Sequence, residues 1–195
     1  EISMFRNCFI RIIYPYDDII SFINKISNNL NAYYKSFNDE EIVVIAVLEG
    51  SIVFAGYLLM TLDFNVIFKS LKVVSEDPTN PAKRDNLKVA ANIKSNEIKN
   101  KRVLIIDTLM DTGKTLHCVY SFVKDLNPKD IKICTLFKKE KSKDENFMRS
   151  PSKTLLKLDW YGATIPNQWV AGFGLDSRNK YRNIKHLGVV RIEKR

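Results

Sequence analysis

Hydrophobic residues in this chain fall into short runs that alternate with amphipathic or polar stretches. Four segments are predicted to be strands of a sheet: Glu41–Leu48, Asn65–Val74, Val103–Ile106 and Ile131–Phe137. Glu41–Leu48 is a continuous apolar run, as in a strand buried on both faces. The amphipathic or apolar segments Ser51–Leu62 and Lys114–Leu126 follow the first and third of these predicted strands and are predicted to be helices. This strand–helix alternation predicts an α/β fold with a mostly parallel, twisted sheet flanked by helices.

The rest of the chain adds an amphipathic helix at Tyr16–Tyr34, with Asp17 and Asp18 near its positive end. Three later apolar segments are predicted to be strands: Leu158–Ala163, Val170–Phe173 and Leu187–Ile192. No repeat or linker divides the chain, so we expect one domain over residues 1–195. In a sheet of this kind, ligands bind at the carboxyl ends of the strands.

Two polar segments interrupt this pattern. Glu76–Asn86 contains two prolines and lacks apolar periodicity, which indicates a long loop. Leu87–Ile93 is predicted to return as a strand, so residues from about 75 to 88 are expected to form a flap. The basic segment from about 139 to 157 includes a Ser-Pro pair and is expected to be an exposed excursion.

Composition narrows the class of protein. The chain has 195 residues, 45% of them hydrophobic and 27% charged, which is typical of a soluble globular protein. No apolar run has membrane-spanning length, so we expect no membrane partner and a cytoplasmic location. Cys8, Cys118 and Cys134 form no C-x-x-C pair and are expected to be reduced thiols. His117 and His186 stand alone, which argues against zinc.

The formal net charge of +9 favours an anionic partner. The basic residues are spread along the chain, and no RNA-binding motif is present, so nucleic acid is not the expected ligand. A small polyanionic substrate fits the charge better. A high lysine content from codon bias would produce the same value.

The segment Val103–Thr115, with the sequence VLIIDTLMDTGKT, carries the clearest chemistry. Its apolar run ends in two acids, Asp107 and Asp111, and Thr112 to Thr115 then open a helix. Backbone N–H groups, hydroxyls and the positive end of the helix are predicted to form a phosphate site. A P-loop is excluded because the required earlier glycine is Thr108. An ordinary strand–helix junction capped by Thr and Asp is the alternative.

This segment resembles the signature of phosphoribosyltransferases, and most closely the hypoxanthine-guanine phosphoribosyltransferase family. The resemblance implies binding of the 5-phosphate and ribose of phosphoribosyl pyrophosphate (PRPP) by Asp107, Thr108, Asp111, Thr112, Gly113, Lys114 and Thr115. It also implies that Asp111 faces N7 of the purine and acts as the catalytic base.

Two shorter segments extend the resemblance. Leu48-Glu49-Gly50-Ser51 lies where the family has Leu-Lys-Gly, a loop that binds pyrophosphate through backbone N–H groups and often contains a cis peptide. Glu49 and Gly50 are therefore assigned to pyrophosphate. Phe137-Lys138-Lys139 resembles the family's apolar-Lys-basic step, which implies that Lys138 binds the oxygen on C6 of the purine.

The second long match is Ile165–Asp176, with the sequence IPNQWVAGFGLD. By resemblance, Trp169 stacks on the purine and the Val170 backbone bonds its polar edge. Asp176 is assigned both to the purine-binding residues and, together with Asp107, to Mg²⁺. Arg182 lies at the position of the family's pyrophosphate-binding arginine.

Three departures from the family pattern bear on activity. The usual pair of acids is Asp107-Thr108, so one carboxylate that would contact the ribose is replaced. The Ser-Tyr pair of the flap is Ser75-Glu76, and the segment Lys139–Lys157 is longer than usual.

The resemblance implies a type I phosphoribosyltransferase fold with a small hood built from the chain ends and a mobile flap. It implies purine salvage: transfer of the 5-phosphoribosyl group from PRPP to hypoxanthine or guanine, with Mg²⁺, giving IMP or GMP and pyrophosphate. A homodimer or homotetramer is expected. The alternatives are a non-catalytic PRPP- or RNA-binding regulator on the same fold, and a phosphoribosyltransferase for another base such as xanthine.

Overall fold

A computed structural model describes residues 2–5, 8–37, 40–75, 87–140 and 156–192 of the chain. Its main sheet has six strands in the order β5-β4-β3-β6-β7-β8. Their bounds are Ile42–Leu48 for β3, Val66–Ser75 for β4, Leu87–Ala90 for β5, Arg102–Met110 for β6, Asp130–Lys139 for β7 and Trp160–Ile165 for β8. All neighbours pair in parallel except β5, which is antiparallel to β4. The expected mostly parallel sheet is confirmed.

Helices cover both faces of this sheet. Helices α1 (Tyr16–Tyr34) and α2 (Ile52–Leu59) pack with Val44 and Ala46 of β3 on one face. Helix α4 (Lys114–Asp125) packs with Val43 and Ile45 on the other. Because successive side chains of a strand point to opposite faces, the continuous apolar run of β3 supplies both cores. The short elements α3 (Ser95–Ile98) and the 3-10 turn Lys35–Phe37 complete the helices of the described residues.

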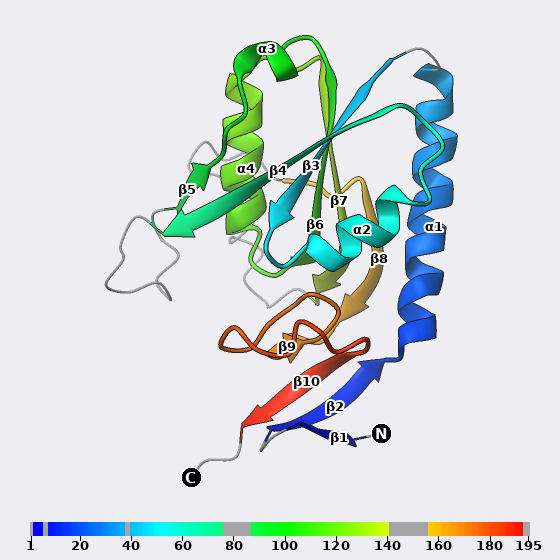
Figure 1. The fold of residues 1–195 in the computed structure, drawn as a ribbon, viewed down its shortest axis with the longest axis vertical. Coiled ribbons are helices and arrows are strands. Elements are labelled where there is room, and N and C mark those ends of the chain that lie inside the picture. The colour runs from blue at the N-terminus through cyan, green and yellow to red at the C-terminus, as the bar shows by residue number, and fades with distance from the viewer. Residues whose placement is uncertain (1, 6–7, 38–39, 76–86, 141–155, 193–195) are drawn as a thin grey trace.

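The two chain ends form a second sheet, which is the expected hood. Its order is β1-β2-β10-β9, with antiparallel pairing of β1 (Ile2–Phe5), β2 (Cys8–Tyr14), β10 (Leu187–Ile192) and β9 (Val170–Ala171). In Figure 1 this sheet lies beneath the arrowheads of β6, β7 and β8. The backbone N–H of Tyr16 donates to Nδ1 of His186 at 2.9 Å, which ties helix α1 to the hood.

Several elements differ from the sequence prediction. Strand β6 continues to Met110, so Asp107 and Thr108 belong to a paired strand and not to a loop. Strand β9 is only two residues long because Gly172, Phe173 and Gly174 adopt positive φ angles of 105°, 48° and 91°. Strands β1 and β2 were not predicted. Residues 76–86 of the flap and 141–155 of the basic segment lie outside the described residues.

The order in which strands are added to the sheet reverses at its centre, on either side of β3. After β3 the chain forms β4 on one side of β3, and it later returns to form β6 on the other side. Such a switch point leaves a crevice at the carboxyl ends of the two central strands. The loops after β3 and β6 therefore flank the place where a ligand is expected.

Candidate functional site

The loop after β6 has the geometry of an anion site. Gly113 precedes α4 with a φ of 80°, a left-handed conformation that glycine adopts without steric strain. Its carbonyl accepts the first helical bond of α4, from the N–H of His117 at 2.8 Å. The first-turn N–H groups of a helix have no partner within the helix and attract anions. Thr112 is exposed, and Lys114 and Thr115 are half-buried beside it.

The carboxylate of Asp111, just past the end of β6, forms an ion pair with Lys139 at the end of β7. Lys139 Nζ lies 2.9 Å from Asp111 Oδ2. The side chain of Lys139 is only 10% exposed, whereas that of Asp111 is 45% exposed. A hydrogen-bond acceptor, Asp111, and a donor, Lys139, thus lie side by side at the carboxyl ends of β6 and β7, next to the phosphate loop.

Lys138 does not share this position. Its ammonium lies 3.9 Å from the centroid of the Tyr161 ring, on an exposed part of β8. Consecutive residues of a strand point to opposite sides, so only one of the two lysines can face Asp111. Of the two lysines, Lys139 pairs with the acid, and the assignment of Lys138 to the purine oxygen stays a prediction.

The loop after β3 carries the expected cis peptide, between Leu48 and Glu49. The Glu49 carboxylate lies 2.6 Å from Nζ of Lys72 on β4 and 3.7 Å from a guanidinium nitrogen of Arg182. The hydrogen bond from Lys72 holds the pKa of the Glu49 carboxyl below its usual value, and the charges of Lys72 and Arg182 act in the same direction. In the region expected to bind pyrophosphate, the side chains of Lys72 and Arg182 therefore form ion pairs with Glu49.

The hood loop brings Asp176 and Arg182 to the same region. Arg182 lies 2.9 Å from Asp176 Oδ1 and donates to the Gly174 carbonyl at 2.8 Å. The N–H of Asn179 donates to the other oxygen of Asp176 at 2.8 Å. These bonds fix the carboxylate and the guanidinium beside the loop that carries Glu49.

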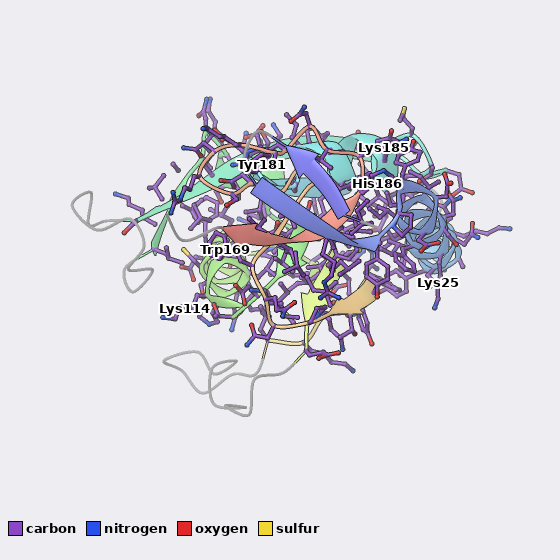
Figure 2. All side chains as sticks on the ribbon, turned by 90° about the horizontal axis from the view of Figure 1, so that it is seen from below. Lys25, Lys114, Trp169, Tyr181, Lys185 and His186 are labelled. Carbon is purple, nitrogen blue, oxygen red and sulfur yellow. The ribbon has the colours of Figure 1, made fainter. Side chains whose placement is uncertain are left out.

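Trp169 and Val170 differ in exposure. The Trp169 side chain is 60% exposed, which is unusual for so large an apolar group, whereas Val170 is 5% exposed and pairs with Val189 of β10. The Trp169 carbonyl accepts from the N–H of Val190 at 2.9 Å, which anchors the backbone while the ring stays accessible. Figure 2, seen from the hood side, labels Trp169 beside β10 and Lys114 at the near end of α4.

Thr108 contacts the loop after β3. Its side chain is fully buried, and its hydroxyl donates to the Gly50 carbonyl at 2.9 Å. The hydroxyl therefore faces the loop after β3, and the ribose contact of Thr108 stays a prediction. Asp107 is 9% exposed, and its Oδ1 accepts the N–H of Thr108 at 2.7 Å.

The predicted flap lies only partly within the described residues, and the predicted metal ligands Asp107 and Asp176 both lie within them. Ser75 ends β4 opposite Leu87 of β5, and Glu76 lies outside the described residues. Among the described residues, no three His, Cys, Asp or Glu side chains gather to form a metal site. Mg²⁺ often uses only one or two carboxylates together with substrate phosphates, so Asp107 and Asp176 suit it chemically.

Sequence reasoning missed Lys139 and Lys72. Residues 133–137 of β7 are buried on both faces, so alternation along this strand does not indicate which lysine faces the site. Lys72 lies in the half-exposed β4, directly opposite Leu48 in the parallel register with β3. That register places its side chain next to the Glu49 loop, and only the sheet order reveals it.

Comparisons with known proteins agree with this geometry. The phosphoribosyl transferase domain family matches residues 14–178. A hypoxanthine-guanine-xanthine phosphoribosyltransferase of Tritrichomonas foetus is 28% identical over 93% of this chain and 91% of its own. A hypoxanthine-guanine phosphoribosyltransferase of Streptococcus pyogenes is 29% identical over 94% of each chain. A solved hypoxanthine-guanine phosphoribosyltransferase of Bacillus anthracis has a TM-score of 0.77 and 27% identity, covering 95% of this chain and 99% of that one.

Within the described part of the chain, none of the helices is both long and apolar enough to span a bilayer.

Proposed function

The chain belongs to the phosphoribosyl transferase family, and we propose that it is a purine-salvage enzyme within it. It transfers the 5-phosphoribosyl group of PRPP to hypoxanthine or guanine and releases pyrophosphate, giving IMP or GMP. The observation that carries this proposal is the Asp111–Lys139 pair, 2.9 Å apart beside the phosphate loop. Relatives with hypoxanthine-guanine phosphoribosyltransferase names cover almost the whole chain, which supports the same function.

The pair suits a 6-oxopurine because its two members present opposite hydrogen-bonding characters. The ammonium of Lys139 offers only donors, which match the oxygen on C6 and reject the amino group of adenine. The carboxylate of Asp111 accepts only, which matches a protonated ring nitrogen. A base that enters between them separates the ion pair and bonds each member. Trp169 then stacks on the purine face, and the backbone of Val170 bonds its far edge.

In the reaction, N9 of the base forms a bond to C1 of the ribose as the bond from C1 to the pyrophosphate oxygen breaks. Asp111 accepts the proton that the base loses at N7. The loop Asp111–Thr115 holds the 5-phosphate, and Asp107 bonds the ribose hydroxyls. Catalysis follows mainly from holding both reactants in line and from stabilising the separated charges.

The pyrophosphate end of PRPP lies between the loop after β3 and the hood. The backbone N–H groups around Gly50 and the guanidinium of Arg182 bind its oxygens. Asp176 and Asp107 would hold Mg²⁺, which would supply positive charge beside the leaving pyrophosphate.

Exposed apolar side chains and a buried thiol support the proposed assembly and location. Ile52 of α2 is 58% exposed, Met60 directly after this helix is 77% exposed, and Phe68 of β4 is 45% exposed. Such exposed apolar side chains support a homodimer or homotetramer, which light scattering after gel filtration tests. Cys134 is a buried free thiol, and burial raises its pKa, which suits a reducing cytoplasm.

The direct test is a spectrophotometric assay with PRPP, Mg²⁺ and one of five bases: hypoxanthine, guanine, xanthine, adenine or uracil. We expect turnover with hypoxanthine or guanine and none with adenine or uracil. Turnover with xanthine would extend the specificity to that named for the Tritrichomonas relative.

One observation favours a second function, that of a PRPP-binding regulator without catalysis. Glu49 brings a negative charge into the region where the leaving pyrophosphate must bind. PRPP binding in calorimetry without turnover for any of the five bases would support the regulator over the enzyme.

A further inference from the structure

Three segments that are distant in sequence meet at one backbone atom, the carbonyl oxygen of Gly50. From β6, the hydroxyl of Thr108 donates to it at 2.9 Å. From the hood loop, Gly174 approaches so closely that a Cβ at this position would lie 2.7 Å from the same oxygen. The contact between Thr108 and Gly50 thus ties the end of β6 to the loop after its paired neighbour β3, at the switch point of the sheet.

Gly50 is the residue of its loop that most needs such a restraint. Glycine has the widest choice of backbone conformations, so a peptide that follows it can rotate at low cost. The neighbouring groups are already held: the N–H of Ile52 donates to the Glu49 carbonyl at 3.2 Å, and Ser51 Oγ donates to the Val47 carbonyl at 2.6 Å. The bond from Thr108 fixes the remaining peptide, between Gly50 and Ser51.

The direction of this peptide matters for an anionic ligand. A carbonyl oxygen carries partial negative charge, whereas a backbone N–H carries partial positive charge. With the Gly50 carbonyl held inside by Thr108, that oxygen cannot turn toward the crevice. Without the bond, the peptide can rotate and present its oxygen to an incoming anion.

We propose that Thr108 is a positioning residue for pyrophosphate: its buried hydroxyl holds the Gly50 carbonyl inward, so that the loop after β3 presents N–H groups and not an oxygen to the leaving group. This proposal rests on the proposed function. It gives Thr108 a role in the pyrophosphate half of the site in place of the ribose contact that the sequence suggested.

The test compares three substitutions in the full-length protein. Thr108→Val removes the hydroxyl and keeps the shape, and Thr108→Ser keeps the hydroxyl. Thr135→Val is the matched control, because Thr135 is equally buried on the neighbouring strand β7, opposite Asp107, and its hydroxyl has no partner among the described residues. Thr108→Ala removes the same hydroxyl and replaces Thr108→Val if that variant does not fold.

Two measurements are made on each variant. Steady-state kinetics give KM for PRPP and for hypoxanthine, and calorimetry gives Kd for pyrophosphate with Mg²⁺. We expect Thr108→Val to raise KM for PRPP and Kd for pyrophosphate by about three- to tenfold, as for the loss of one hydrogen bond. KM for hypoxanthine should stay within about twofold, Thr108→Ser should restore both values, and Thr135→Val should change neither.

Three results would overturn the proposal. They are unchanged pyrophosphate affinity in Thr108→Val, equal impairment of Thr108→Ser and Thr108→Val, and a parallel rise of KM for PRPP and hypoxanthine. If the wild-type protein binds pyrophosphate and PRPP but does not turn over, the proposed enzyme fails while calorimetry still decides the role of Thr108. If the wild-type protein binds neither, both proposals fall.

Discussion

The two halves of the candidate site differ in how their backbones are held. Asp107 and Lys139 belong to β6 and β7, whose register fixes them against neighbouring strands, and Asp111 follows directly after β6. Asp176 and Arg182 belong to a hood loop that turns through positive φ angles at Gly174, Arg178, Asn179 and Tyr181. Trp169, at the edge of the hood, is 60% exposed.

This difference suggests a division of work. Groups on paired strands lose little freedom when a substrate binds, so they suit steps in which atoms must be held within a few tenths of an ångström. Groups on loops are held by fewer backbone bonds and contribute mainly affinity. We therefore expect substitutions on the strand half to lower kcat/KM most strongly, and substitutions on the hood half to cause smaller losses that appear mainly in KM or Kd.

The strongest test of the strand half is Asp111→Asn. The amide keeps the size of the side chain but cannot accept the proton from the base, so kcat should fall on the order of a hundredfold or more. Kd for PRPP, measured by calorimetry, should change far less. Asp125→Asn, at the exposed end of α4, is the control and should leave both values unchanged. A normal kcat in Asp111→Asn would remove this residue from the chemistry.

The second test separates the two lysines of β7. Lys139→Gln should raise KM for hypoxanthine by about tenfold or more and reduce the preference for hypoxanthine over adenine, because an amide both donates and accepts. Lys138→Gln is the matched control and should change neither, since its ammonium lies over Tyr161. The quantity to measure is the ratio of kcat/KM for the two bases. The opposite result would favour the assignment made from the sequence alone.

These lysines show where sequence reasoning stops. The order of strands and helices and the position of the phosphate loop could be predicted, because buried strands and helix starts leave periodic and local signals. The side to which Lys138 and Lys139 point could not, because the strand before them is apolar on both faces. The partner of Thr108 could not be predicted either, since only the three-dimensional structure shows that Gly50, distant in sequence, accepts its hydroxyl.

The hood half is tested by Trp169→Ala. Loss of stacking on the base should raise Kd for hypoxanthine by about 5- to 30-fold, equivalent to about 1–2 kcal/mol, with kcat nearly unchanged. Trp169→Phe should recover most of the affinity. Phe68→Ala removes another exposed aromatic ring, on β4, and serves as the control. If PRPP affinity falls together with hypoxanthine affinity in calorimetry, Trp169 supports the hood structure and not the base.

The smallest effect is expected where the two halves meet, at Glu49. Its carboxylate binds Lys72 and Arg182, the cations that pyrophosphate would otherwise attract. Glu49→Gln should therefore lower Kd for pyrophosphate, whereas Lys72→Gln should raise it. Because both side chains of the Glu49–Lys72 pair are more than half exposed, at 54% and 53%, solvent screens the pair and the change should be only about two- to fivefold.

The dependence of this effect on pH and salt shows whether Glu49 competes with pyrophosphate for Lys72 and Arg182 or orders these two side chains for it. Lys72 holds the pKa of Glu49 below its usual value, so the carboxylate stays charged as the pH falls from 8 to 6. The gap between the wild-type protein and Glu49→Gln should remain constant over that range, and it should close only as the pH falls through the lowered pKa. Added salt should narrow it at every pH. A higher Kd in Glu49→Gln would mean that the acid orders Lys72 and Arg182 for pyrophosphate, and the hood half would then be as preorganised as the strand half.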